Sequence, residues 1–164
     1  MKDLDVKEMP LEQKFNGLFD FYMLDSAINY AYHEEQGTVE QWLDYTLEGY
    51  GGYMGPMFEM MKKVTPGKAF KEAANQMVYM QQMWQPLSEI EVSLVSDREA
   101  VMRFKNCEML RRSREIVKKA GLKIDPKFFC KMDLYRHAHP SHPLKEFMTC
   151  ELEENGCKWT LKLK

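Results

Sequence analysis

The chain has 164 residues and a mass of 19.4 kDa, close to the usual size of one domain with one hydrophobic core. Apolar residues make up 45% of the chain and charged residues 29%, a balance typical of globular proteins, which excludes a disordered chain. The formal net charge of −2 excludes a strongly cationic nucleic-acid binder as the default class.

The sequence lacks the patterns of membrane insertion and export. No apolar run reaches the ~18 residues that a membrane span requires, and the start of the chain has no signal-peptide pattern. We therefore expect a cytoplasmic protein without a membrane span, in which the four cysteines stay reduced.

Apolar residues at helical spacing predict three helices in the N-terminal part, which covers residues 11–85. The first helix is expected over 11–35 and ends at a glycine. The second begins at the capping-box pattern of residues 38–41 and is expected to break or kink at the glycine- and proline-rich segment 49–56. The third is expected over 68–85, between two prolines.

The periodicity then changes in the part that covers residues 88–164. Alternating apolar and polar residues predict a hairpin of two strands at 89–94 and 100–105. Helical spacing returns over 107–121, and a further short helix is expected over 125–137, with an aspartate as its N-cap.

A second hairpin is expected at the C-terminal end, with strands over 146–153 and 157–163 around Asn155-Gly156. With a two-residue turn, Cys150 and Cys157 share a face but lie roughly 13 Å apart along the ladder, too far for one ion or a disulfide. A four-residue loop would bring them closer. Either way, one face carries Cys150, Leu152, Cys157, Trp159, Leu161 and Leu163.

These elements predict one α+β domain over residues 1–164. N-terminal helices pack on an antiparallel sheet made of two hairpins, with one or two helices between the hairpins.

Basic residues concentrate between residues 103 and 136, where eleven basic side chains accompany four acidic ones. This segment carries +7 and the remainder of the chain −9. It is either a solvated helix face or a basic rim that attracts an anionic small molecule or an acidic partner, with Arg111 as a candidate contact. Nucleic acid is not expected, because aromatic residues do not interleave with the basic ones.

Cys107 is the first candidate nucleophile. If Asn106 caps the following helix, the thiol lies in its first turn, where the helix dipole lowers a thiol pKa, and Arg111 could add to the effect. The other interpretation is a buried cysteine between strand and helix. Cys130 is a second candidate nucleophile, and a base could come from His137 or His139.

A cluster of histidines follows Cys130. His137, His139 and His142 in a proline-containing loop could present several imidazoles to one metal ion, with the Cys130 thiolate completing the site. The spacing matches no standard zinc signature, and a solvent-exposed turn explains it equally. The cofactor is therefore unknown, and a metal is one possibility.

Methionine and aromatic residues recur at helical spacing in the N-terminal part. They either pack the core, since methionine fills irregular gaps, or line a deformable pocket for a small ligand. The candidate ligand contacts of this group are Tyr50, Tyr53, Met57, Met61, Met80 and Trp84.

The stretch over residues 106–159 resembles the C-terminal half of the L-2-amino-thiazoline-4-carboxylate hydrolase-like family and, more distantly, the vinyl-4-reductase (hydrocarbon-binding) domains. The resemblance is carried by Asn106-Cys107, Arg114, Gly121-Leu122, Phe129-Cys130, Cys150 and Gly156-Cys157-Lys158-Trp159. It implies an α+β ligand-binding fold with an apolar pocket between helices and sheet and with the four cysteines at recurrent positions. The chain lacks the paired cysteines and the Pro-Pro-Asp stretch that some relatives carry before the last hairpin.

The favoured function is a small-molecule-binding domain for an apolar or anionic ligand, with a methionine and aromatic pocket and a rim that includes Cys150, Cys157 and Trp159. One alternative is a thiol-dependent hydrolase of a small cyclic C–N or C–S compound. Another is metal binding by Cys130 and the histidine loop. A second copy of the chain is a possible partner, because methionine and aromatic surface favours association.

Overall fold

The computed structural model describes residues 9–83, 86–140, 142 and 145–163, with backbone only at 50–54, 56–58 and 87. The N-terminal part consists of α1 (Leu11–Gln36), α2 (Val39–Met61) and α3 (Lys68–Gln81), as the apolar spacing predicts. Gly37 ends α1 in the left-handed conformation (φ 66°), which glycine adopts without steric cost. Helix α3 is four residues shorter than expected.

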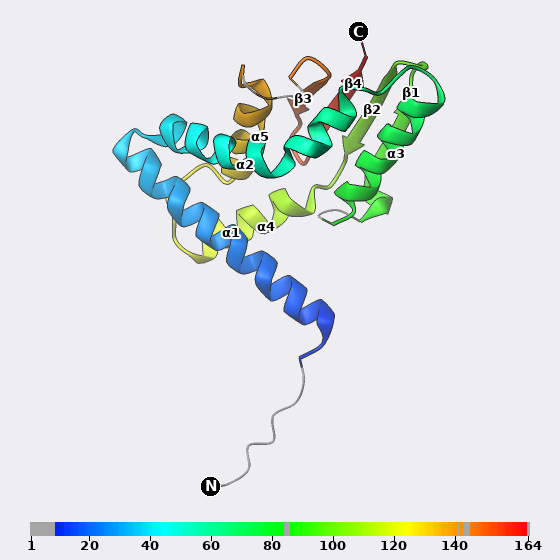
Figure 1. Cartoon of the computed structure of the whole chain (residues 1–164). Coiled ribbons are helices and arrows are strands. Elements are labelled where there is room, and N and C mark those ends of the chain that lie inside the picture. The colour runs from blue at the N-terminus through cyan, green and yellow to red at the C-terminus, as the bar shows by residue number, and fades with distance from the viewer. Residues whose placement is uncertain (1–8, 84–85, 141, 143–144, 164) are drawn as a thin grey trace, which may run out of the picture.

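Helix α2 continues through the glycine- and proline-rich segment 49–56, so of the two expected alternatives, a break or a kink, the break does not occur. Among the described glycines, positive φ angles occur at Gly37, Gly67 and Gly121 and not in this segment. Glycine permits a left-handed turn but does not impose one, and a proline inside a helix removes one hydrogen bond without having to end it. Figure 1 shows α2 changing direction partway along its length, which agrees with the predicted kink.

The C-terminal part alternates hairpins and helices. All its strands pair antiparallel in the order β1-β2-β4-β3, and the pairing of β2 with β4 joins the two hairpins into one sheet. This arrangement confirms the α+β class with N-terminal helices packed on an antiparallel sheet. The elements are η1 (Leu87–Glu89), β1 (Ile90–Leu94), β2 (Glu99–Phe104), α4 (Glu108–Lys119), α5 (Phe128–Ala138), β3 (Met148–Leu152) and β4 (Cys157–Lys162).

The β3–β4 hairpin has a four-residue loop, so the two-residue turn is wrong. Cys150 lies opposite Trp159, and Leu152 lies opposite Cys157. The register differs by two residues from the expected one, and therefore the same side chains still share a face. Cys150 and Cys157 are thus diagonal neighbours across the two strands, closer than the two-residue turn implied.

The tertiary environment of Gly156 explains the longer loop. A Cβ atom at Gly156 would lie 1.8 Å from the carbonyl oxygen of Phe104, so the glycine allows the loop to approach β2. The carbonyl oxygen of Asn155 accepts a hydrogen bond from the backbone N–H of Cys107 at 2.8 Å. Asn155-Gly156 therefore docks the hairpin onto the start of α4 instead of forming the centre of a tight turn.

The buried residues form two clusters, and α5 contributes to both. One cluster lies on the sheet, where Phe70 and Ala74 of α3 pack against Met102, Trp159 and neighbouring strand residues. The other is formed by helices, with Phe19, Met23, Ala27, Tyr30, Leu43, Val117, Phe128, Phe129 and Met132 buried. Figure 1 shows α1 and α4 on the side of the molecule away from the sheet strands.

Helix α5 begins three residues later than expected. The Asp125 carboxylate accepts a hydrogen bond from the backbone N–H of Lys127 at 2.7 Å, so it caps a turn that precedes the helix. None of the helices in the described part of the chain combines the length and apolar character needed to cross a bilayer.

Candidate functional site

One face of α5 brings three polar side chains toward the β3–β4 hairpin. Cys130, Asp133 and His137 recur at i, i+3 and i+7, which places them on one side of the helix. Cys130 packs on the sheet cluster together with Cys150 and Cys157. We call this group the thiol–imidazole site, and it consists of Cys130, Asp133, His137, Cys150, Cys157 and Trp159.

His137 occupies the end of α5 that lies against β4. Its ring is 4.6 Å from the ring of Trp159 in an edge-to-face arrangement and 4.4 Å from the ring of His142. Nδ1 of His137 is buried and has no hydrogen-bond partner among the described residues. Burial, followed by the nearby His142 and Arg136, lowers the pKa of His137 to about 3, so the imidazole is neutral at pH 7.

The thiols of the site are held in the protonated form. Burial raises the pKa of the Cys130 thiol to about 12. The pKa of Cys157 is also raised, first by a hydrogen bond with Cys150 and then by burial. None of the four cysteines, all of which lie in the described part of the chain, forms a disulfide. A nucleophilic thiol needs a lowered pKa, and this environment does the opposite.

Asp133 also belongs to the site, and it is not among the candidates predicted from the sequence. Its spacing of three residues from Cys130 on a helix could have predicted that the two share a face. The Asp133 carboxylate lies 3.7 Å from the guanidinium of Arg136. Its side chain is 45% exposed, yet burial raises the pKa of its carboxyl.

Cys107 is a buried residue between β2 and α4, so the expectation of a thiol within the first helical turn is wrong. Cys107 is itself the N-cap, and α4 starts one residue later. Its side chain belongs to the sheet cluster. Asn106, the expected cap, donates a side-chain hydrogen bond to Glu89 instead. The buried-cysteine interpretation therefore fits the structure.

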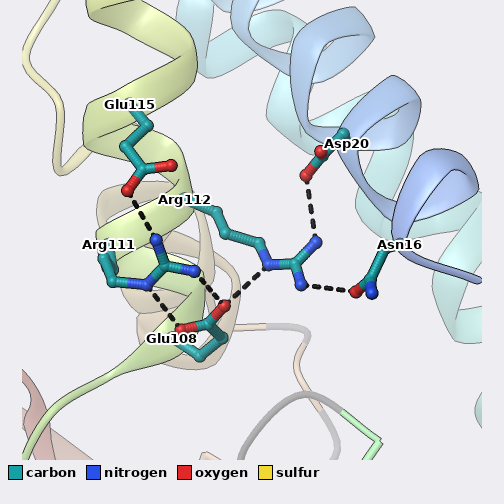
Figure 2. A network of polar contacts seen from close by, with 6 residues as sticks. All are labelled: Asn16, Asp20, Glu108, Arg111, Arg112 and Glu115. Carbon is teal, nitrogen blue, oxygen red and sulfur yellow. Dashed lines mark hydrogen bonds and ion pairs between the residues drawn. The ribbon is translucent and has the colours of Figure 1, made fainter. Parts of the chain in front are cut away.

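Arg111, a predicted ligand contact, forms ion pairs with carboxylates of its own helix, α4. Its Nε donates a hydrogen bond to Glu108 at 2.7 Å, and its guanidinium also pairs with Glu115. Hydrogen bonds from Arg111 and Arg112 lower the pKa of Glu108 to about 2, against the opposing effect of burial. Figure 2 shows Arg112 extending the network to α1, where it reaches Asn16 and Asp20.

Other side chains of the basic segment are also paired with carboxylates. Arg103 contacts Glu153 at 2.8 Å, and Lys131 contacts Asp125 at 2.6 Å. These pairs, with the Arg111 network, fit the interpretation of a solvated, salt-bridged surface.

The predicted metal ligands are not gathered around one point. His139 Nε2 lies 3.4 Å from the Asp44 carboxylate of α2, while the His137 ring lies against Trp159. The side chains of His137 and His139 point to different sides because α5 extends to Ala138, and residues two positions apart lie on nearly opposite sides of a helix. Within the described residues, no group of three or more His, Cys, Asp or Glu side chains is arranged for a metal. The metal set of Cys130, His137, His139 and His142 is therefore not assembled, and His139 is not placed as a base.

The predicted methionine pocket is only partly described. Tyr50, Tyr53 and Met57 have side chains outside the described residues, and Trp84 lies wholly outside them. Met80 is half-buried on α3. Met61 lines an apolar hollow between α3 and the sheet of about 20 Å³, which holds about one water molecule. Ligand pockets measure roughly 300–1,000 Å³, so Met61 is a packing residue here.

No family model, curated protein or solved structure matches this chain. The resemblance of residues 106–159 to the hydrolase-like family therefore stays a prediction. The structure brings together five residues that the sequence had selected, which are Cys130, His137, Cys150, Cys157 and Trp159.

Proposed function

We propose that this chain is a small-molecule-binding domain whose ligand lies in the thiol–imidazole site. The observation that carries the proposal is the buried Nδ1 of His137, which lacks a hydrogen-bond partner among the described residues. An unsatisfied buried polar atom costs about 1–3 kcal/mol. A ligand with one complementary polar group would offset this cost by bonding to His137 beside the ring of Trp159.

The chemistry of the site favours an uncharged ligand. The thiols of Cys130 and Cys157 are protonated at pH 7, and the imidazole of His137 is neutral. Arg136 places a positive charge near His137, and the Asp133 carboxylate lies 3.7 Å from its guanidinium. The buried Nε of Arg136 has no hydrogen-bond partner among the described residues. An anion in the site would have to share this guanidinium with Asp133, and burying an incompletely paired charge is costly. An apolar molecule with one polar group therefore suits the thiol–imidazole site better than the anionic ligand that the sequence also allowed.

The hydrolase alternative requires a thiolate beside a base. Cys130 and His137 do share a face of α5, but the Cys130 thiol is far from ionised at pH 7 and His137 is a weak base. The same groups serve a binding site well, because protonated thiols and a neutral imidazole present a desolvated, weakly polar wall. Binding is thus the function that the geometry supports best.

Four aromatic fragments test this proposal. Phenol donates a hydrogen bond, acetophenone accepts one, toluene does neither and benzoate is an anion. We expect phenol or acetophenone, according to the tautomer of His137, to shift the indole NMR signal of Trp159, which a Trp159→Phe variant assigns. Toluene should bind more weakly than the better polar fragment, and benzoate more weakly still. The proposal is overturned if no fragment shifts this signal, or if benzoate binds most tightly.

A further inference from the structure

Helix α1 exposes a row of large apolar side chains on the face opposite its buried face. Phe19, Met23, Ala27 and Tyr30 face the helical cluster. A solvated helix of a globular protein normally has polar residues on the other side. On α1 the other side instead has Leu11, Leu18, Phe21, Ile28 and Tyr32 exposed by 82, 72, 75, 51 and 59%.

These exposed residues follow the seam of a coiled coil. The positions alternate at spacings of three and four, which is the heptad pattern of a helix that packs against another helix. Two charged residues of opposite sign, Lys14 and Asp25, occupy the remaining positions of the row. We call this row the α1 seam, and it consists of Leu11, Lys14, Leu18, Phe21, Asp25, Ile28 and Tyr32.

The α1 seam is complementary to itself when two copies pair antiparallel. If a two-fold axis passes midway between residues 19 and 20, Leu18 lies level with Phe21 of the second copy. The same register places Leu11 level with Ile28 and Lys14 level with Asp25 of the second copy. From Leu11 to Ile28, one register therefore matches apolar with apolar and cation with anion.

A parallel pair would lack this match. It would place Lys14 beside Lys14 and Asp25 beside Asp25 of the second copy, and like charges at facing seam positions repel. The two charges thus select the antiparallel orientation. The Asp25 carboxylate, which accepts a hydrogen bond from Asn29 at 3.2 Å, keeps further acceptor positions for a lysine.

We propose that the chain forms a homodimer through antiparallel pairing of the α1 seam. The four apolar residues that face each other in this register, Leu11, Leu18, Phe21 and Ile28, expose roughly 500 Å² per copy, at about 180 Å² for a fully exposed large side chain. Two copies would bury about 1,000 Å² from these residues, and Phe15 and Tyr22 at the edge of the seam raise the area to the lower end of stable interfaces. Figure 1 shows α1 along the edge of the molecule, with its N-terminal half extending past α4, so that a second helix has access.

Charge reversal tests both the dimer and its orientation. Sedimentation equilibrium of the full chain should give a dimer at micromolar concentration. Lys14→Asp places two aspartates at the same level of the antiparallel pair, twice per dimer, and should raise the dissociation constant at least tenfold. The double variant Lys14→Asp/Asp25→Lys should return it to within threefold of wild type. Gln13→Glu, an exposed change outside the seam, is the control.

Phe21→Glu tests the apolar part of the seam and should give a monomer with unchanged circular dichroism, because Phe21 is exposed in the single copy. A wild-type chain that is monomeric at 100 μM overturns the proposal. So does a dimer that persists with Phe21→Glu, or one whose dissociation constant does not change with Lys14→Asp.

Discussion

His137 is neutral in the folded protein, while in the unfolded chain it titrates near its ordinary value of 6.5. Between pH 6.5 and about 3 the unfolded state therefore binds more protons, so the free energy of unfolding falls as the pH falls. His142, whose pKa is also lowered by burial, acts in the same direction. The lowered pKa values of His137 and His142 therefore make the folded protein less stable in acid.

We expect the free energy of unfolding of wild type to fall by about 2 kcal/mol between pH 7 and pH 5 through His137, at 1.36 kcal/mol per pH unit below its ordinary pKa. His137→Phe keeps an aromatic ring and removes the titrating group, so its pH dependence should be shallower by about this amount. Urea denaturation at the two pH values measures both. His139→Phe, whose ring lies beside Asp44 outside the site, is the control. Parallel losses in wild type and His137→Phe would contradict the assignment.

The raised pKa of Cys130 predicts that its thiol reacts slowly with alkylating reagents. Iodoacetamide at pH 7.5 should modify Cys130 and Cys157 at least about 100-fold more slowly in the folded protein than in urea, because only the thiolate reacts. Peptide mapping by mass spectrometry gives the rate at each cysteine. If one cysteine reacts in the folded chain faster than in the unfolded chain, the hydrolase alternative becomes the better explanation.

At the scale of elements, α1 and α4 are joined by Arg112. Its side chain is 17% exposed, and its guanidinium bonds Glu108, Asp20 and Asn16 and lies 4.9 Å from the centre of the Phe19 ring. Arg111, the next residue along α4, has partners on α4 and is 54% exposed. The two arginines therefore form a matched pair of variants.

Arg112→Ala should lower the free energy of unfolding by about 1–3 kcal/mol, because it removes bonds to a second helix and leaves polar partners unsatisfied. Arg111→Ala should cost less than about 1 kcal/mol, since exposed ion pairs within one helix contribute little. Urea denaturation at neutral pH compares them. Equal losses in the two variants would show that the contacts to α1 add nothing.

Most elements could be predicted from the sequence because their signals are local. Apolar spacing and Gly37 determine α1, and alternation determines β1 and β2. The register of the last hairpin could not be predicted, because it depends on the close approach of Gly156 to the backbone of Phe104, which is far away in the chain. The continuity of α2 likewise depends on its surroundings and not on its glycines alone.

In the candidate site, too, some features follow from the local sequence and others depend on contacts with distant parts of the chain. The shared face of Cys150, Cys157 and Trp159 follows from strand parity, which a shift of two residues leaves unchanged. The pairing of Arg111 could have been predicted locally, because Glu108 and Glu115 lie three residues before it and four after it on the same helix. The contact of His139 with Asp44 could not, because Asp44 lies on α2, far away in the chain.

For the whole molecule, α5 links the helical cluster to the sheet. Its Phe128 and Phe129 rings pack against Tyr30 and Tyr22 of α1, while its other face carries the thiol–imidazole site. The α1 seam lies on the side of α1 away from the buried Tyr30, so the proposed dimer does not use the face of α5 that carries the thiol–imidazole site. The proposed ligand binding and the proposed association can therefore be tested separately.

If a neutral ligand bonds to His137, the preference of the site for a polar fragment over toluene depends on this imidazole, and the His137→Phe variant measures that dependence. We compare the dissociation constant of toluene with that of the better polar fragment, phenol or acetophenone, by titration at the Trp159 indole signal. In wild type and in the His139→Phe control the polar fragment should bind about tenfold more tightly, which corresponds to about 1.4 kcal/mol for one hydrogen bond. In His137→Phe this preference should disappear. A preference of unchanged size in His137→Phe would show that the ligand does not bond to this imidazole.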